Sequence, residues 1–416
     1  MKNYVLVGTG NRGLGMFIRG LARDGLEPNI ARITGLYDIN ATRCRAVHKE
    51  MNRDYATVYT DFDEMLDKEN PDAVIVASTD NTHAPYIVRA LDKGYNVISE
   101  KPICNTFEHC KEIREAERRN NKKVTVTFNM RFDPTLIKLK ELVSSGVIGK
   151  VHSVSYNYSL NRWHGGDYFK RWHRFMDISQ GMLVHKSTHH FDVLSWIIDE
   201  EPIKVSAIGN RVFYGNEERA YGKRCSACPA ADKCESQKSQ SANNDKMLYF
   251  DAEHEDGYIR DRCAFLSDTD IYDNMSVSVL YSGGALLTYS LNLFAMREGY
   301  TAVITGETGT IITSHYKSDV AADGAAEGDG DKITVMKSES EAEIIEIPRE
   351  GGSHNGSDAR IRAMLFGDGK IEDPLGQMAD SFDGFSSALI GISANESIKT
   401  GASVDMTKLL DELRKE

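Results

Sequence analysis

The strongest constraint on the fold of this chain is a glycine-rich turn that follows its first apolar run. Residues 4–7 have the character of a buried strand, and residues 14–21 are apolar enough for a packed helix. Between them stands Gly8-Thr9-Gly10-Asn11-Arg12-Gly13, which fits the pattern G-x-G-x-x-G. The first glycine of that pattern permits a tight turn, the second lets the backbone approach a diphosphate, and the third allows close helix–strand packing. The turn predicts a βαβ nucleotide-binding unit whose cofactor contacts are Gly8, Gly10, Asn11, Arg12 and Gly13.

The first third of the chain continues this alternation of strands and helices. Short apolar runs recur, separated by stretches of good helix formers such as residues 108–120. This order is typical of an α/β domain, in which helices cover both faces of a parallel sheet. We expect its strands at residues 4–7, 32–37, 73–77, 96–98 and 124–128.

From about residue 150 the pattern changes to that of an antiparallel sheet. Residues 151–158 alternate with period two, and residues 275–294 contain two alternating strands around Ser282-Gly283-Gly284, a hairpin signal. We therefore expect two domains, an N-terminal Rossmann domain and a C-terminal α+β domain with an open, mostly antiparallel sheet. Their expected bounds are 1–130 and 131–416, with a cysteine-containing insertion at about 216–265 and an acidic loop tip at 319–331.

Charge and cysteine content limit the partners and the compartment. The 416 residues carry 50 Lys+Arg and 62 Asp+Glu, a formal net charge of −12, which argues against a nucleic-acid or anionic-membrane surface. The sequence contains no run of about 18 apolar residues, which is the length that a membrane-spanning helix needs. The opening Met1-Lys2-Asn3 lacks the features of an export signal. The chain has seven cysteines, an odd number that does not suit a framework of paired disulfides. We expect reduced thiols and a cytoplasmic protein.

Asp38 bears on the choice of nucleotide. It ends the second predicted strand, near the place where a carboxylate binds the adenosine ribose hydroxyls in Rossmann domains. A carboxylate there repels a 2′-phosphate, so the sequence favours NAD over NADP. Arg43, close by in the sequence, keeps NADP open as an alternative.

Three motifs together support a family resemblance. Thr79-Asp80-Asn81-Thr82-His83 follows the strand expected at 73–77, and Glu100-Lys101-Pro102 follows the strand expected at 96–98. His189-His190-Phe191-Asp192 opens a helix in the second domain. With the glycine turn, these motifs resemble the Gfo/Idh/MocA oxidoreductases, of the glucose-fructose oxidoreductase and inositol dehydrogenase types, over essentially the whole chain.

The resemblance implies hydride transfer between a nicotinamide cofactor and a carbon of a sugar, cyclitol or polyol. It also implies a homodimer or homotetramer formed through the exposed face of the C-terminal sheet. Lys101 takes the family position beside the nicotinamide and the substrate hydroxyl, while Arg131 and Tyr156 take positions that border the substrate pocket. The further cofactor contacts implied are Thr79, Asn81, His83, Glu100 and Lys101.

The stretch 181–196 is dense in titratable groups. On one continuous helix His185, His189 and Asp192 share a face, and imidazoles beside a carboxylate suit general acid–base chemistry. The family has Asp where this chain has His185. We predict that His189 is the general acid–base and that His185 assists it. Lys186 and Asp192 are predicted to contact the substrate. Two alternatives remain: the histidines are hydrogen-bonded structural residues, or they bind a metal ion.

Aromatic and basic residues are mixed in the stretch 161–174. Trp163 and His164 lie there among several Arg and Tyr side chains. Flat aromatic faces beside hydrogen-bond donors suit a sugar ring, so we predict that Trp163 and His164 bind substrate. A loop that packs between the domains is the alternative.

Three cysteines within ten residues mark the insertion. Cys225, Cys228 and Cys234, with Cys263 further on, have spacing that suits a structural zinc ion with four thiolate ligands. An iron–sulfur cluster and unligated thiols are the alternatives.

Three functions remain open at the level of sequence. The first is an NAD(P)-dependent oxidoreductase acting on a sugar, cyclitol or glycoside. The second is redox-neutral glycoside cleavage, in which a sugar carbon is oxidised only transiently before elimination. The third is a regulatory protein that binds the cofactor without catalysis.

Overall fold

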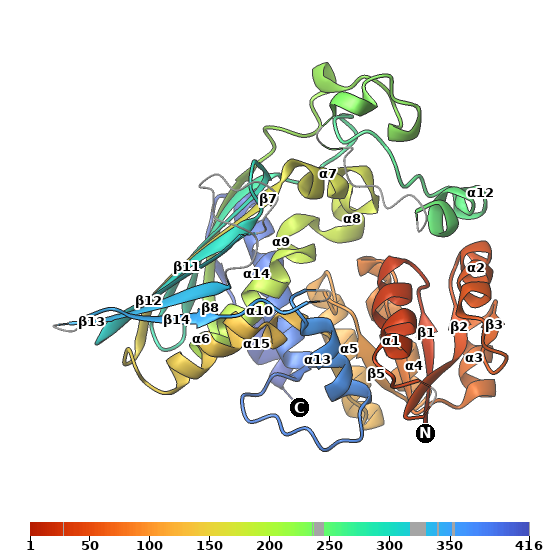
Figure 1. Ribbon diagram of the computed structural model, residues 1–416, viewed down its shortest axis with the longest axis horizontal. Coiled ribbons are helices and arrows are strands. Elements are labelled where there is room, and N and C mark those ends of the chain that lie inside the picture. Colours follow the sequence, from red (N-terminus) through yellow and green to blue (C-terminus); the bar gives the residue numbers. More distant parts are fainter. Residues whose placement is uncertain are drawn as a thin grey trace.

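The protein is described by a computed structural model covering residues 1–27, 29–234, 236, 245–316, 330–338, 341–351 and 354–415. Most of the predicted acidic loop tip at 319–331 lies outside the described residues. Figure 1 shows a Rossmann domain and a large second sheet at opposite ends of the molecule, with α9 (Gly181–His185), α10 (Ser187–Ile198) and α14 (Ser381–Thr400) between them.

The first sheet is parallel except at one edge, and it confirms the predicted Rossmann domain. Its strand order is β15-β6-β5-β4-β1-β2-β3, in which the order reverses next to β1, and only β15 runs antiparallel to its neighbour. Its strands are β1 (Lys2–Val7), β2 (Ala31–Tyr37), β3 (Thr57–Tyr59), β4 (Ala73–Val76), β5 (Asn96–Ser99), β6 (Val124–Val126) and β15 (Ala379–Asp380).

The helices of this domain begin at side-chain caps that the sequence supplies. Asn40, Asp61 and Thr106 accept hydrogen bonds from backbone N–H groups in the first turns of α2, α3 and α5. The helical segments are η1 (Gly13–Ile18, a π-helix), α1 (Arg19–Arg23), α2 (Ala41–Met51), α3 (Phe62–Glu69), η2 (Asp80–Thr82), α4 (His83–Asp92), α5 (Phe107–Asn120) and η3 (Asn129–Phe132).

The second sheet is open and mixed, with a single parallel pair, β7 and β10. The predicted hairpin between β9 and β10 is present, and Gly284 at its turn has φ +97°. The strand order is β14-β13-β12-β11-β7-β10-β9-β8-β16. The strands are β7 (Val151–Asn161), β8 (Pro202–Asn210), β9 (Asn274–Tyr281), β10 (Leu286–Ala295), β11 (Gly299–Gly306), β12 (Gly309–Tyr316), β13 (Asp331–Lys337), β14 (Glu343–Ile347) and β16 (Val404–Asp405).

Helices cover one face of this sheet and leave the other open. The open face carries exposed apolar side chains, among them Ile208, Leu286 and Ile312, next to inward-facing buried neighbours. The predicted oligomer contact through this face remains a prediction. The helices of the second domain are α6 (Pro134–Ser144), α7 (Arg162–Lys170), η4 (Trp172–Arg174), α8 (Met176–Ser179), α9 (Gly181–His185), α10 (Ser187–Ile198), α13 (Ser357–Phe366), α14 (Ser381–Thr400) and α15 (Thr407–Arg414).

The chain returns to the Rossmann domain at several places after residue 131. Phe366 of α13 packs edge-on against Tyr4 and Phe17, and β15 extends the first sheet beside β6. Leu248, from the insertion, is also fully buried in the core between the first sheet and its helices. The predicted domain bounds remain a prediction, but the later segments of the chain belong to both cores. The insertion contains η5 (Glu217–Arg219), η6 (Cys225–Ala227), η7 (Ala231–Lys233), η9 (Lys246–Phe250, a π-helix) and α12 (Glu253–Asp256).

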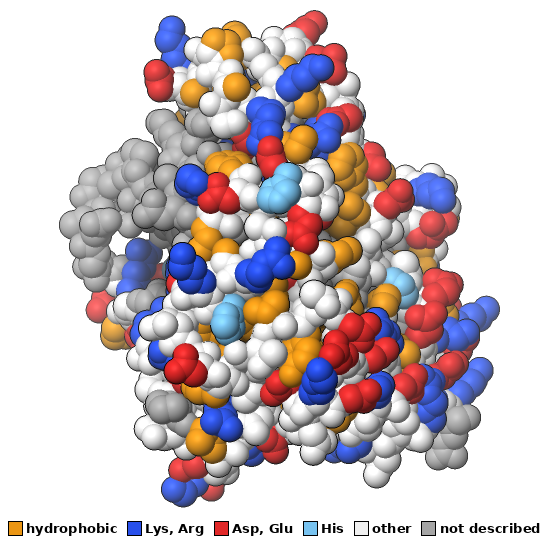
Figure 2. Space-filling view, turned by 90° about the vertical axis from the view of Figure 1, so that its right-hand side faces the viewer, with side chains coloured by type: hydrophobic (Ala, Val, Ile, Leu, Met, Phe, Trp, Pro, Cys, Tyr) orange, Lys and Arg blue, Asp and Glu red, His pale blue; other side chains and the backbone are white. Residues whose placement is uncertain are grey.

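The Rossmann end of the molecule carries both signs of charge. Figure 2 shows acidic and basic side chains interspersed over this face rather than gathered into one basic area.

Candidate active site

The glycine turn adopts the geometry that its sequence predicts. Gly8 has φ +90°, and a Cβ there would lie 2.5 Å from the Ala77 carbonyl oxygen. A Cβ on Gly13 would lie 2.1 Å from the Gly8 carbonyl oxygen, so both positions require glycine. The Leu14 N–H donates to the Gly10 carbonyl at 2.9 Å and starts the helical segment. The turn is thus a cradle of backbone at a helix N-terminus, which suits a diphosphate.

Asp38 stands directly beside this cradle. Its Oδ2 accepts hydrogen bonds from the Thr9 N–H at 2.7 Å and the Thr9 hydroxyl at 2.9 Å. Its Oδ1 accepts from the Asn40 N–H at 2.9 Å and lies 3.2 Å from Arg43 Nη1. The carboxylate is therefore fixed at the end of β2, next to the glycine turn, and its role toward ribose remains a prediction.

Arg12 and Glu100 are paired with each other. Arg12 Nε donates to Glu100 Oε1 at 2.7 Å, and Arg12 Nη1 lies 3.2 Å from Asp358 of α13. The Asn129 side-chain amide also donates to Asp358, at 2.9 Å. These contacts tie the glycine turn to the segment after β5 and to α13.

Residues 79–83, which follow β4, contact the segment that follows β5 and carries Lys101. The Thr79 hydroxyl donates to Asn81 Oδ1 at 3.0 Å. The two ring nitrogens of buried His83 lie 2.7 Å from the Pro102 carbonyl oxygen and 3.1 Å from the Ser78 carbonyl oxygen. His83, predicted as a cofactor contact, is engaged with backbone on both sides and so holds the position of the segment that carries Lys101.

Lys101, His185 and Asp80 form the centre of the site. Lys101 Nζ donates to the His185 carbonyl at 2.9 Å, and His185 Nδ1 lies 2.7 Å from Asp80 Oδ2. Burial lowers the pKa of Lys101, against the opposing charges of Asp80 and Glu100. Burial also lowers the pKa of His185 and raises the pKa of Asp80, the latter against the opposing charge of Lys101.

The predicted continuous helix over 181–196 is wrong. The structure has two helices, α9 and α10, with a break at Lys186, so the 100° rotation per residue does not carry across it. His189 lies in the first turn of α10, half-buried, with its ring 5.9 Å from that of Phe128. Burial, followed by the charges of Lys101 and Lys186, lowers the pKa of His189. The imidazole is therefore neutral at neutral pH and able to accept a proton.

His173 and Trp172, from the mixed stretch 161–174, also belong to this cluster. The His173 ring lies 4.1 Å from that of His185, centroid to centroid, and stacks on Trp172 at 3.6 Å. The predicted substrate residue His164 lies on α7, with Nδ1 3.0 Å from Glu298, and Trp163 stacks on it at 5.5 Å. The mixed composition of residues 161–174 was the signal for this region, but sequence alone did not show which ring faces His185.

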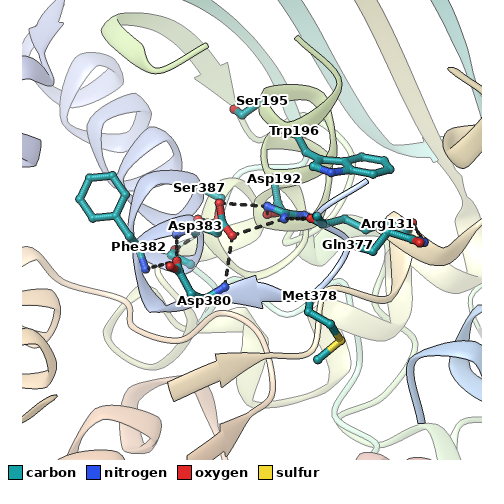
Figure 3. Close-up of polar contacts among 12 residues, drawn as sticks. Arg131, Asp192, Ser195, Trp196, Gln377, Met378, Asp380, Phe382, Asp383 and Ser387 are labelled. Atoms are coloured by element: carbon teal, nitrogen blue, oxygen red, sulfur yellow. Dashed lines mark hydrogen bonds and ion pairs between the residues drawn. The ribbon is translucent and has the colours of Figure 1, made fainter. Parts of the chain in front are cut away.

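Asp192 pairs with Arg131 rather than with the histidines. Its carboxylate accepts two hydrogen bonds from Arg131, from Nε at 2.9 Å and from Nη2 at 2.6 Å. The side chains of Arg131 and Asp192 are 4% and 1% exposed, and Asp383 of α14 lies 3.2 Å from Arg131 Nη2 (Figure 3). Burial disfavours the charged guanidinium, but these carboxylates outweigh it and raise the pKa of Arg131. Both residues were predicted to contact substrate; the structure places them in a buried ion pair between η3, α10 and α14.

Tyr156 is likewise inside the protein. It is fully buried on β7, in an aromatic layer with Tyr300, Tyr289 and Tyr158. Lys186 lies at the edge of this layer, with Nζ 5.3 Å from the centre of the Tyr158 ring. The period-two alternation of β7 turns Tyr156 toward the helices, and its predicted substrate contact remains a prediction.

The four cysteines of the insertion line one small cavity. Cys225, Cys228, Cys234 and Cys263 all contribute to its wall. Burial raises the pKa of Cys225 to about 12. Within the described ranges, no group of three or more His, Cys, Asp or Glu side chains is placed to hold a metal ion. The predicted zinc site therefore has no support in the described residues.

Fold and site together define a two-domain oxidoreductase with an NAD-binding Rossmann fold. Residues 2–128 match the oxidoreductase family model with the NAD-binding Rossmann fold, and residues 140–406 match the model for its C-terminal α/β domain. The chain belongs to the Gfo/Idh/MocA oxidoreductase family, as its motifs predict.

Relatives and solved structures agree with this assignment. The Bacillus subtilis (strain 168) protein named as oxidoreductase YteT is 34% identical over 384 residues, which cover 88% of this chain and 89% of that protein. An inositol 2-dehydrogenase of Rubrobacter xylanophilus is 29% identical over 204 residues, 47% of this chain and 52% of that protein. A 2,7-anhydro-N-acetylneuraminate hydratase of Mediterraneibacter gnavus is 29% identical over 217 residues, 51% and 54% of the two chains.

The fold is also that of a solved levoglucosan dehydrogenase, in complex with NADH and L-sorbose. Its TM-score is 0.71 at 17% identity, and the match covers 98% of this chain and 100% of that one. In the part of this chain that the structure describes, every helix is too short or too polar to cross a membrane.

Proposed function

We propose that this protein is an NAD-dependent oxidoreductase that transfers a hydride between the cofactor and a hydroxyl-bearing carbon of a sugar, cyclitol or glycoside. The observation that carries the proposal is the cluster of Lys101, His185 and His189. Lys101 comes from the Rossmann domain and the histidines from the second domain, so the cluster lies where the two domains meet. The inositol 2-dehydrogenase relative supports the substrate class.

The residues of the first domain fit a dinucleotide. The glycine cradle leaves no room for a Cβ at Gly8 or Gly13, and Asp38 stands at its edge with a fixed carboxylate. These residues would hold the diphosphate and the adenosine ribose, respectively. When bound, the nicotinamide supplies or takes the hydride, and the protein supplies orientation and proton transfer.

Lys101 and His189 accept the proton of the substrate hydroxyl during oxidation and return it during reduction. Lys101 is held by the His185 carbonyl, and its lowered pKa brings proton exchange closer to neutral pH. The buried Nδ1 of His189 has no hydrogen-bond partner among the described residues. A neutral imidazole is suited to receive a proton from the hydroxyl during oxidation and to return it during reduction.

Redox-neutral cleavage of a glycoside is the second candidate. It needs further proton transfers, and the observation that favours it is the contact of a second imidazole, His173, with His185 at 4.1 Å. The relative named as a hydratase adds support for chemistry without net oxidation.

The deciding experiment follows absorbance at 340 nm while the protein turns over a panel of free polyols, cyclitols and glycosides with NAD. Steady accumulation of NADH is the expected result. Release of the leaving group without net NADH would favour the second candidate, and NADH binding without any turnover would favour a regulatory role. Lys101→Met and His189→Ala should abolish turnover, while Lys93→Met, at a surface lysine paired with Asp67, should not.

A further inference from the structure

The insertion returns to the Rossmann domain and packs on the helix that follows Asp38. Leu248 is fully buried in the Rossmann core, and its carbonyl accepts a hydrogen bond from Arg43 Nε at 2.9 Å. The Ala252 carbonyl accepts from the Asn40 side-chain amide at 2.9 Å. Figure 1 shows the result: α12 lies above the end of α2, far along the sequence from it.

Two carboxylates of the insertion occupy the start of α2. Glu255 accepts hydrogen bonds from the Ala41 N–H at 3.0 Å and the Thr42 N–H at 2.6 Å. These bonds, above all those from Thr42, lower the pKa of Glu255, so the group is ionised at neutral pH. The first N–H groups of this helix thus already bind an anion that belongs to the chain itself.

The second carboxylate engages Arg43. Asp256 Oδ2 lies 2.7 Å from Arg43 Nη2, while Nη1 of the same guanidinium lies 3.2 Å from Asp38. With the Leu248 carbonyl on Nε, all three nitrogens of Arg43 have an oxygen partner within the protein. Burial opposes the charge on Arg43, but the surrounding acidic groups outweigh this and raise its pKa.

These contacts lie where NAD and NADP differ. In Rossmann domains the carboxylate at the end of the second strand binds the 2′-hydroxyl of NAD, and a nearby arginine accommodates the 2′-phosphate of NADP. Here the nearby arginine is Arg43. A 2′-phosphate at this edge would face Asp38, Glu255 and Asp256, and would find both Arg43 and the first N–H groups of α2 already occupied.

We propose that Glu255 and Asp256, supplied by the insertion, make this protein select NAD over NADP. The inference rests on the proposed function in one respect, namely that the protein binds a nicotinamide dinucleotide. Asp38 alone would not exclude NADP, because Arg43 stands 3.2 Å from it and, without Asp256, would be available to bind a 2′-phosphate. The inference therefore assigns to the insertion a role in the choice of cofactor.

The test compares the binding of NADH and NADPH by nicotinamide fluorescence. The wild type should bind NADH at least about tenfold more tightly than NADPH, since like charges at one site oppose binding. Glu255→Gln/Asp256→Asn keeps the side-chain shape and one acceptor oxygen on each residue. The preference for NADH over NADPH should shrink at least about tenfold in this variant, while NADH affinity changes little. The matched control is Asp251→Asn, which removes an exposed carboxylate of the same segment that pairs with Lys246.

Each outcome bears on one claim. An unchanged preference in the double variant, or a wild type that binds both dinucleotides equally, would overturn the inference while leaving the proposed function in place. A wild type that binds neither dinucleotide would overturn the proposed function. Should the double variant fold poorly, displacement of NADH from the wild type gives the same answer: adenosine 5′-monophosphate should compete, and equal competition by adenosine 2′-monophosphate would contradict the inference.

Discussion

His185 Nδ1 lies 2.7 Å from Asp80 Oδ2, across 105 residues of sequence and across the two domains. Asp80 is in η2, just after β4 of the Rossmann sheet, and His185 ends α9. The same histidine accepts a hydrogen bond from Lys101 through its carbonyl oxygen. His185 of the second domain is thus held by the segments that follow two adjacent strands of the first, β4 and β5.

Removal of the Asp80 carboxylate should impair turnover without unfolding the protein. In Asp80→Ala, His185 loses its partner and its orientation, and we expect kcat to fall roughly tenfold to a hundredfold, less than the roughly 10²–10⁴ that a general acid or base itself contributes. KM for the cofactor should change little. Asp80→Asn retains an oxygen acceptor and should recover part of the activity, and the surface variant Asp63→Ala should match the wild type. Equal kcat in Asp80→Ala and wild type would contradict the positioning role.

The acidic limb of the pH–rate profile should lie well below pH 6.5. Burial and the charges of Lys101 and Lys186 lower the pKa of His189, so the imidazole remains neutral as the pH falls through the usual histidine range. Lys186→Met removes one of these charges, which should raise the pKa of His189 and move the limb of kcat/KM to higher pH. Lys204→Met, at an exposed position on β8, is the control. A limb at or above pH 6.5 in the wild type would show that His189 is not the base.

The sequence predicted the elements with local signatures. The glycine turn, the five predicted strands of the first sheet and the hairpin between β9 and β10 each depend on residues close together in the chain, and all are present. β3 was missed, because the segment Thr57–Tyr59 is too short to show a pattern.

The site was predicted only where its residues stand in such local motifs. Lys101 and His189 were predicted from such motifs, and their catalytic roles remain predictions. Asp80 stands inside a motif that was recognised, yet its role was not, because its partner His185 comes from the other domain. Tyr249 lies 3.1 Å from the Asn11 N–H across 238 residues, and no local pattern marks such a contact. The assumption of one unbroken helix misplaced Asp192, since the structure has two helices that break at Lys186.

Asp38→Ala should weaken the binding of NADH. The loss of charge-assisted hydrogen bonds to the ribose should cost roughly 1–3 kcal/mol, measured by calorimetry. Because Asp38 also accepts bonds from Thr9, the thermal midpoint of the free protein must be measured alongside. Asp38→Asn, which keeps an acceptor for Thr9, should show a smaller loss. Unchanged NADH affinity in Asp38→Ala would remove this residue from the cofactor site.

The last prediction concerns the buried pair of Arg131 and Asp192. Arg131→Met leaves the Asp192 carboxylate buried with no cation beside it, and the loss of one partner of a buried pair costs roughly 3–5 kcal/mol of unfolding free energy. Urea unfolding should show this loss. Arg131→Met/Asp192→Leu removes both charges and should be more stable than the single variant. Asp383→Asn, where the carboxylate is 40% exposed, should cost less than about 1 kcal/mol and serves as the control.

The sequence suggested that Arg131 and Asp192 contact the substrate. Steady-state kinetics can distinguish that role from the structural one, provided they are measured at a temperature where the variants are folded. If the pair only joins η3 to α10 and α14, Arg131→Met/Asp192→Leu should retain its KM for substrate within about threefold, because neither side chain is accessible to a ligand and a lost hydrogen bond to substrate would cost more than that. A large rise in KM with unchanged stability would instead place Arg131 and Asp192 at the substrate, as the sequence suggested.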